Sequence, residues 1–126
     1  MKKLLFVTLI LCFNFLYAEE NKINLFELYK ELHANPELSY QEFETSEKLA
    51  LILENIGYEV TRNIGGNGVV ALLQNGEGKT VMLRADMDGL PVEEKTGATY
   101  ASKKKALNAE GKEVFTMHAC GHDVHM

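Results

Sequence analysis

The stretch that decides the fold class is YEVTRNIGGNGVVALLQNGEGKTVML, residues 58–83. Its apolar residues have strand-like rather than helical spacing and are interrupted by two glycine-containing turns. The pattern predicts strands at Tyr58–Ile64, Val69–Leu73 and Thr80–Leu83. Because Val69–Leu73 is apolar at consecutive positions, we expect that strand to be covered on both faces.

Two helices are expected before these strands. Asn24 is the predicted N-cap of a first helix that ends at about His33. Ser39 and Glu42 have the spacing of a capping box and predict the start of a second helix, which Gly57 ends. We expect these two helices to pack on a mixed sheet, so the predicted fold class is α/β.

The N-terminus has the pattern of an export signal. Two lysines precede the apolar run Leu4–Tyr17, and small Ala18 stands before charged Glu19. The run is shorter than the ~20 residues that a membrane span needs. We therefore expect residues 1–18 to be a signal peptide and residues 19–126 to be periplasmic or secreted, with no stable membrane anchor after cleavage.

Composition narrows the function classes. The chain has 126 residues, of which 46% are apolar, and a formal net charge of −5, which suits one globular domain rather than a disordered tail. The acidic excess argues against a nucleic-acid partner. Without the leader, Cys120 is the only cysteine, so no intramolecular disulfide can form. Cys12 follows the bulky Leu11, which makes lipid attachment a lesser alternative.

Charged residues follow the third predicted strand. Arg84, Asp86 and Asp88 alternate along an extended segment, so their side chains are expected on the same side. They stand at the carboxyl end of the strand, which is where α/β proteins usually bind ligands. From these residues alone, an ion pair that closes the strand and a functional site are equally good interpretations.

The C-terminal segment contains three of the four histidines and the only mature cysteine. If the segment is extended, His118, Cys120 and His122 share a face; if a helix begins near Asp123, His122 and His125 share one. Thiolate and imidazole are preferred ligands of zinc-like metals, and Asp123 is placed to orient a ligating ring. The pattern predicts a metal site whose remaining ligands come from elsewhere in the protein.

Four blocks of sequence resemble the M20 metallopeptidases of the amidohydrolase branch, which includes hippurate, N-acyl-amino-acid and indoleacetyl-amino-acid hydrolases. They are, in chain order, Leu32–Ser39 with Glu42 and Thr45, Arg84–Pro91, Thr96–Gly97 with Tyr100–Ser102, and Met117–Asp123. Their order and approximate spacing agree with the family, and the resemblance covers nearly all of residues 23–126.

The resemblance implies a hydrolase with two adjacent divalent metal ions, Zn, Mn, Co or Ni, that cleaves the amide bond of hippurate-like N-acyl-amino acids or small peptides. It implies Cys120 and His122 as metal ligands and Asp86 as the acidic catalytic residue that supports the metal site. In the wider family a metal-binding histidine stands two residues before that aspartate, where this sequence has Arg84. Paired metals would polarise the amide carbonyl and supply hydroxide near neutral pH.

The family has further site residues after the Cys-Gly-His-Asp block: a Glu-Glu pair, two more histidines and a lid or dimerisation domain. We therefore expect residues 19–126 to be the N-terminal portion of a catalytic domain, inactive alone, and any homo-oligomer to require the full-length form. Glu93-Glu94 precedes the block and is expected in a solvated loop. Lys103–Phe115 is expected as a surface insertion, either a hairpin or a loop.

Two other functions compete with this one. In the first, a small secreted metal-binding protein holds one structural ion with His118, Cys120, His122 and His125, although ligands so close together strain tetrahedral geometry. In the second, Cys120 is the nucleophile of a thiol enzyme, for which the sequence names no orienting partner.

Overall fold

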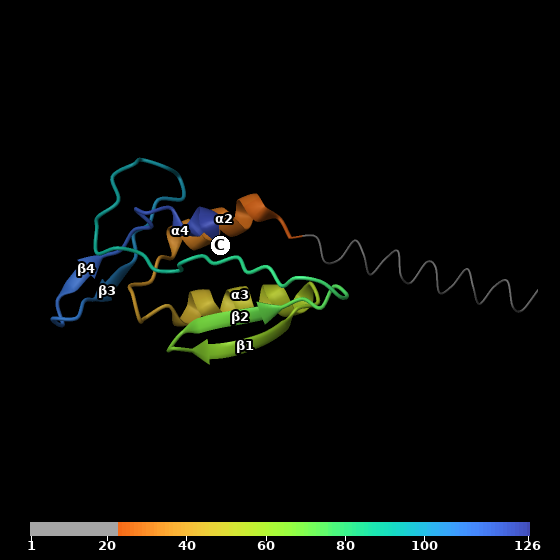
Figure 1. The fold of residues 1–126 in the computed structure, drawn as a ribbon. Coiled ribbons are helices and arrows are strands. Elements are labelled where there is room, and N and C mark those ends of the chain that lie inside the picture. The colour runs from red at the N-terminus through yellow and green to blue at the C-terminus, as the bar shows by residue number, and fades with distance from the viewer. Residues whose placement is uncertain (1–22) are drawn as a thin grey trace, which may run out of the picture.

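The computed structural model describes residues 23–126. In chain order (Figure 1) its elements are helices α2 (Leu25–Ala34) and α3 (Phe43–Asn55), strands β1 (Glu59–Ile64), β2 (Gly68–Leu72), β3 (Lys105–Leu107) and β4 (Glu113–Phe115), and the short helix α4 (His122–His125). Helices combined with two antiparallel sheets confirm the α/β class. The expected signal peptide lies outside the described residues. Within the described part, no helix has the length and apolar character needed to cross a membrane.

Helix α2 begins as the sequence predicts. The side-chain oxygen of Asn24 accepts hydrogen bonds from the backbone N–H groups of Phe26 and Glu27, each at 3.2 Å. These bonds satisfy two of the N–H groups that a helix start leaves without partners, so the predicted N-cap is confirmed. The helix ends at Ala34, shortly before Pro36.

Helix α3 begins later than predicted, at Phe43. Tyr40 has a φ of +65°, so the chain turns there and cannot run on as a helix from Ser39. The Ser39 side chain is exposed, and the N-cap residue Glu42 makes no capping bond with its side chain. The predicted capping box is therefore wrong.

A residue before this turn caps the helix instead. The carboxylate of Glu37 accepts hydrogen bonds from the backbone N–H groups of Glu44, at 3.2 Å, and Thr45, at 2.7 Å. A negative charge at a helix N-terminus also interacts favourably with the helix dipole. Glu37 thus joins the α2–α3 connection to the first turn of α3.

The end of α3 agrees with the sequence. Gly57 has a φ of +96°, and its N–H donates to the carbonyl of Glu54 at 3.0 Å, while the N–H of Tyr58 donates to that of Leu53 at 3.0 Å. These are the two bonds of a Schellman motif, so the predicted termination at Gly57 is confirmed.

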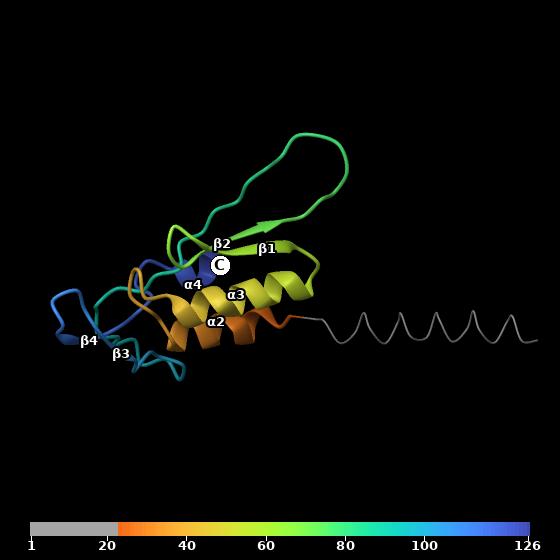
Figure 2. The same ribbon diagram turned by 90° about the horizontal axis from the view of Figure 1, so that it is seen from below.

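Strands β1 and β2 form an antiparallel hairpin, and α3 packs on both strands (Figures 1 and 2). The predicted strand Thr80–Leu83 is not formed, and Val81, Met82 and Leu83 are 82–94% exposed. Figure 2 shows the chain looping away from the hairpin after β2. No strand of the described part pairs with this segment, and both described sheets are antiparallel, so the expected mixed sheet is wrong. Strand β2 is not covered on both faces either, because Val70 and Leu72 are exposed. Helix α2 packs beside α4 rather than on this sheet.

The expected surface insertion is a hairpin. Strands β3 and β4 pair antiparallel, with Lys105 opposite Phe115 and Leu107 opposite Glu113. The Lys105 ammonium lies 2.7 Å from the Glu113 carboxylate on the exposed face. In Figure 1 this hairpin projects from one end of the molecule.

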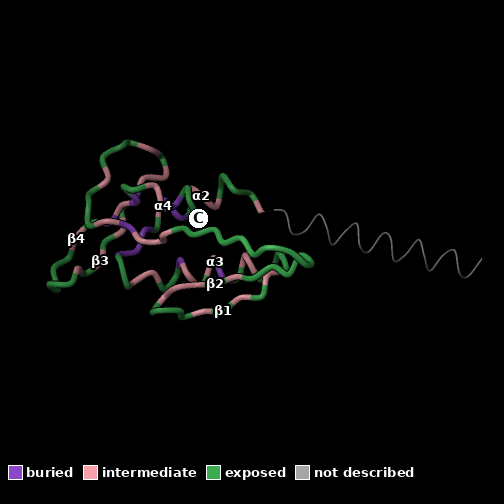
Figure 3. Tube along the Cα trace, viewed as in Figure 1, coloured by how far each residue is buried: buried purple, intermediate pink, exposed green. Residues whose placement is uncertain are grey.

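The interior of the described part is unusually polar. Its buried apolar residues are few and include Leu32, Leu38 and Ala50. The buried polar and charged residues are His33, Glu37, Thr45, Ser102, Thr116, His118 and Asp123. Figure 3 shows buried segments around α2 and α4, whereas β1 and the segment after β2 are largely exposed. Burying polar groups costs free energy unless they have hydrogen-bond partners. A cluster of buried polar residues therefore indicates a functional site in this region.

Candidate metal centre

Three segments distant in sequence lie side by side next to residues 118–122, which we call the donor loop. Leu38 forms a parallel bridge with Gly89, and Leu90 forms an antiparallel bridge with Met117. The N–H of Gly89 donates to the carbonyl of Glu37 at 2.6 Å, and Leu90 and Met117 exchange backbone bonds of 2.8 and 3.0 Å. These bonds bring the end of the Arg-Ala-Asp-Met-Asp-Gly-Leu-Pro block to the start of the donor loop.

Close packing of these segments explains why residue 89 is a glycine. A Cβ atom at this position would lie 2.8 Å from Cβ of Pro36 and 3.3 Å from the carbonyl oxygen of Met117. Both separations are shorter than ordinary van der Waals contact, so a larger residue would push the segments apart. The glycine therefore has a packing role in placing its neighbour Asp88.

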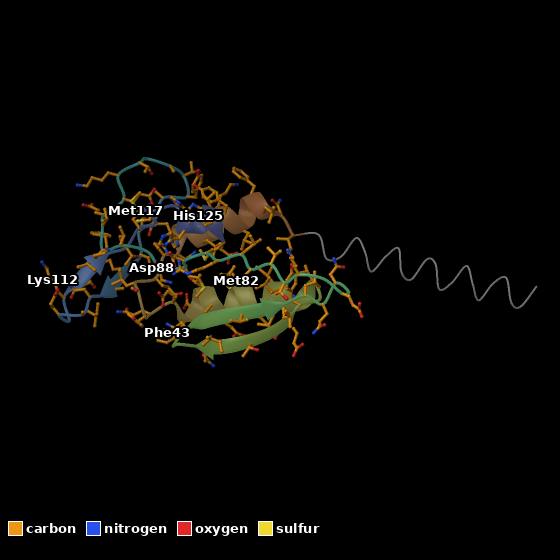
Figure 4. All side chains as sticks on the ribbon, in the orientation of Figure 1. Phe43, Met82, Asp88, Lys112, Met117 and His125 are labelled. Carbon is orange, nitrogen blue, oxygen red and sulfur yellow. The ribbon has the colours of Figure 1, made fainter. Side chains whose placement is uncertain are left out.

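Asp88 fixes the ring of His122. Gly121, with a φ of +76°, turns the chain into α4, which begins at His122. The Nδ1–H of His122 donates to the backbone carbonyl of Asp88 at 2.8 Å, and the Asp88 carboxylate lies 3.0 Å from the same nitrogen. This arrangement leaves the Nε2 lone pair for a ligand. Figure 4 labels Asp88 in the central part of the molecule. The thiol of Cys120, two positions before His122 in the sequence, is free and exposed.

The structure separates Asp88 from the two residues with which it alternates in sequence. Arg84 and Asp86 form an ion pair with an N–O distance of 2.5 Å, and their side chains are 75% and 43% exposed. The ion-pair interpretation thus applies to Arg84 and Asp86, while Asp88 is the carboxylate at the donor loop. The catalytic role of Asp86 remains a prediction from the resemblance.

Asp123, which the sequence predicts to orient a ligating ring, instead contacts a histidine that is not among the predicted ligands. Its Oδ2 lies 2.6 Å from Nδ1 of His33, and Nε2 of His33 lies 3.0 Å from Oε1 of Glu94. These three side chains form a buried chain, Glu94–His33–Asp123, that joins α2 to α4. Burial lowers the pKa of His33, but the hydrogen bonds to Glu94 and Asp123 outweigh burial and place that pKa above its ordinary 6.5.

The expectation that Glu93-Glu94 lies in a solvated loop is wrong for Glu94. Its side chain is fully buried and accepts hydrogen bonds from the Thr96 hydroxyl and the Ser102 backbone N–H, each at 2.5 Å. Burial raises the pKa of Glu94, but these bonds and that to His33 lower it below 4.5. A charged carboxylate is tolerated here because several donors satisfy it.

His118 has no such partner. It is 4% exposed, and neither of its ring nitrogens has a hydrogen-bond partner among the described residues. Burial lowers the pKa of His118, so the ring is neutral at neutral pH. A buried polar group without a partner is destabilising, and such groups are typical of sites that a bound ion or ligand completes.

The thiol and imidazole groups of the donor loop therefore have the chemistry of zinc ligands, but they are too few to complete a coordination shell. A thiol and imidazole nitrogens are the ligands that such metals prefer. However, residues 23–126 contain no group of three or more His, Cys, Asp or Glu residues that could hold a metal ion. The described residues thus supply part of a coordination shell, and the single structural ion held by His118, Cys120, His122 and His125 is not supported. Nor does any histidine of the described part hydrogen-bond to Cys120, as a thiol enzyme would require.

The Glu94–His33–Asp123 chain was not predictable from spacing. His33 and Asp123 are 90 positions apart and His33 and Glu94 are 61 apart, so no periodicity connects them. The available signal was that His33 and Asp123 each stand in a block that resembles the M20 family.

Comparison with known proteins agrees with that resemblance. No family model matches the chain. A thermostable carboxypeptidase of Saccharolobus solfataricus is 43% identical over 104 residues, which cover 81% of this chain and 24% of the relative. The hippurate hydrolase of Campylobacter jejuni is 45% identical over 96 residues, 75% of this chain and 23% of the relative. The solved structure of the Bacillus subtilis YXEP protein, a dinuclear metal-binding peptidase of the M20 family, matches with a TM-score of 0.65 and 38% identity over 79% of this chain and 26% of that one.

The chain belongs to the M20 family. Its M20 relatives are hydrolases and metallopeptidases, as the sequence predicted. The chain spans about a quarter of their length, 23–26% in these three comparisons.

Proposed function

We propose that this chain carries the Cys–His metal-binding segment of a divalent-metal amidohydrolase that cleaves the amide bond of N-acyl-amino acids. One observation carries the proposal: Asp88 holds the His122 ring at Nδ1, and no hydrogen bond within residues 23–126 engages Nε2. The exposed thiol of Cys120 stands two positions earlier in the sequence. A ring fixed at one nitrogen by a carbonyl or carboxylate is the usual arrangement of a ligating histidine.

The roles of the residues follow from this arrangement. Cys120 Sγ and His122 Nε2 are the proposed metal ligands, and Asp88 orients His122. Asp86 is the acidic residue that the resemblance assigns to catalysis. Two divalent metal ions in the complete site would polarise the scissile carbonyl and lower the pKa of a bound water.

The substrate class rests on the relatives. The Campylobacter protein is named for hydrolysis of hippurate, which is an N-acyl-amino acid, and the Saccharolobus protein is named a carboxypeptidase. Both names describe cleavage of an amide bond next to an amino-acid carboxylate. We propose that N-acyl-amino acids are the substrates here, with small peptides as the alternative within the same chemistry.

Export is a separate part of the proposal. It rests on the basic residues, the apolar run and the small residue at Ala18. N-terminal sequencing of the exported protein is expected to begin at Glu19, and retention of Lys2 and Lys3 in that material would contradict it.

Hydrolysis can be tested with a form extended by the segment that follows this region in the M20 relatives. We expect it to release glycine from hippurate in the presence of Zn²⁺, Mn²⁺ or Co²⁺ and to lose activity with a chelator. Cys120→Ala should abolish turnover, whereas Ser39→Ala, a change at an exposed residue outside the donor loop, should retain it. A folded, metal-loaded form that cleaves no N-acyl-amino acid would overturn the proposal.

A further inference from the structure

The ring of His33 has a carboxylate on each side. Nδ1 lies 2.6 Å from Asp123 and Nε2 lies 3.0 Å from Glu94, and neither carboxylate oxygen can donate when ionised. A neutral imidazole has one N–H and could satisfy only one of them. Both contacts are favourable together when both ring nitrogens carry protons, that is, when His33 is an imidazolium.

The surroundings hold this cation in place. The rings of Tyr29 and Tyr100 pack against that of His33, with centroid distances of 5.5 and 5.3 Å. Glu94 is fixed in turn by its bonds to Thr96 and Ser102. The His33 side chain is 11% exposed and that of Asp123 is 3% exposed, so the pair is largely shielded from water.

Helix α4 depends on the contact between Asp123 and His33 for its position. It has only 4 residues, far fewer than the ~12–15 that an isolated helix needs, and no side chain caps its N-terminus. Its anchor to the rest of the molecule is therefore tertiary. Asp123 in its first turn is buried against α2, and this contact fixes the backbone that carries His122 and the residues just before it.

From this geometry we infer that His33 is a positioning residue: an imidazolium held between Glu94 and Asp123, it anchors α4 and so fixes Cys120 and His122 for metal binding. The inference rests on the proposed function, because it assumes that these two residues bind the metal. His33 itself lies behind Asp123, and its two ring nitrogens are both engaged. The metal affinity of the donor loop thus depends on a residue that does not touch the metal.

Cobalt binding to the 126-residue chain provides the test, because coordination of Co²⁺ by a thiolate gives a sulfur-to-metal absorption band. We expect His33→Gln to weaken Co²⁺ binding by about tenfold or more, the effect typical of residues that orient metal ligands. The control is Arg62→Gln, which breaks another network, the ion pairs of Arg62 with Glu47 and Glu54 on α3. Its Co²⁺ affinity should equal that of the wild type.

A double-mutant cycle separates positioning from general loss of structure. If His33 acts through Asp123, the variant with both His33→Gln and Asp123→Asn should lose no more Co²⁺ affinity than the more affected single variant. Losses that multiply would overturn the inference, and so would unchanged Co²⁺ affinity in a folded His33→Gln variant. No thiolate band in the wild type would instead overturn the metal-site proposal itself, and the inference with it.

A measurement on the wild type avoids reliance on any variant. The ¹⁵N resonances of the His33 ring at neutral pH should show two protonated nitrogens. A ring with one protonated nitrogen would contradict the bridging imidazolium, whatever the variants show.

Discussion

Cys120 and His33 are expected to affect metal binding to different degrees. Cys120 is a proposed metal ligand, whereas His33 contacts Asp123 and is proposed to affect the metal site only through it. Thiolate ligation contributes several kcal/mol in complete metal sites and less where other ligands are missing. We predict that Cys120→Ala lowers zinc affinity more than His33→Ala. Calorimetric titration of both variants with Zn²⁺ measures this, and equal affinities would remove Cys120 from the ligand set.

His33 should also make stability depend on pH. Its folded-state pKa lies above the ordinary 6.5 because the bonds to Glu94 and Asp123 outweigh burial. The stabilisation from its charged form is therefore complete below that ordinary pKa and is lost as the pH rises through the folded-state pKa.

The measurement is urea unfolding of the wild type and His33→Gln between about pH 5.5, below the ordinary pKa of histidine, and about pH 8.5, above it. We predict that the difference in their free energies of unfolding is largest at the acidic end and shrinks toward the alkaline end. A difference that stays constant over this window would show that His33 does not change its charge there.

At the level of secondary-structure elements, the start of α3 gives a direct comparison between the cap predicted and the cap observed. We predict that Glu37→Gln lowers the free energy of unfolding by about 1 kcal/mol, because it removes the charge that two backbone N–H groups share. Ser39→Ala should have almost no effect. Thermal unfolding of both variants distinguishes them, and a larger loss for Ser39→Ala would restore the capping box.

The elements that the sequence predicted well are those fixed by neighbours in the chain. Asn24 caps α2 and Gly57 ends α3 through bonds to residues at most five positions away. The cap from Glu37 and the chain from His33 to Asp123 depend on how distant segments pack, which local spacing does not encode. Likewise Val81–Leu83 has a strand-like sequence but no paired neighbour in the described part, and pairing rather than pattern decides whether a strand forms.

At the scale of the whole molecule, Gly89 lies where three segments distant in sequence meet beside the donor loop. We predict that Gly89→Ala destabilises the protein by about 1–3 kcal/mol, the usual cost of overpacking, and shifts the amide resonances of the donor loop. Gly57→Ala is the comparison: nothing lies within 4 Å of its added Cβ, so only backbone strain of about 1 kcal/mol is expected. If both variants shift the donor loop alike, the packing role of Gly89 is not specific.

The last prediction concerns the activity of the 126-residue chain. Its described residues place Asp88 against the ring of His122, two positions after Cys120, but contain no group of three donors that could hold one metal ion. Glu94 does not supply a general base, because its side chain is fully buried and engaged by His33, Thr96 and Ser102. Lack of general acid–base help alone typically costs about 10²- to 10⁴-fold in rate, and a weakly held metal adds to this loss.

We therefore expect no measurable chelator-sensitive hydrolysis of hippurate or N-acetyl-amino acids by the 126-residue chain, although it should bind Co²⁺ through Cys120. The assay compares it with the extended form under identical metal concentrations, and only the extended form should turn over substrate. Robust metal-dependent turnover by the 126-residue chain, abolished by Cys120→Ala, would show that residues 23–126 contain a complete catalytic site and that the count of donors is wrong. Turnover unaffected by Cys120→Ala would place the activity elsewhere and remove the donor loop from the mechanism.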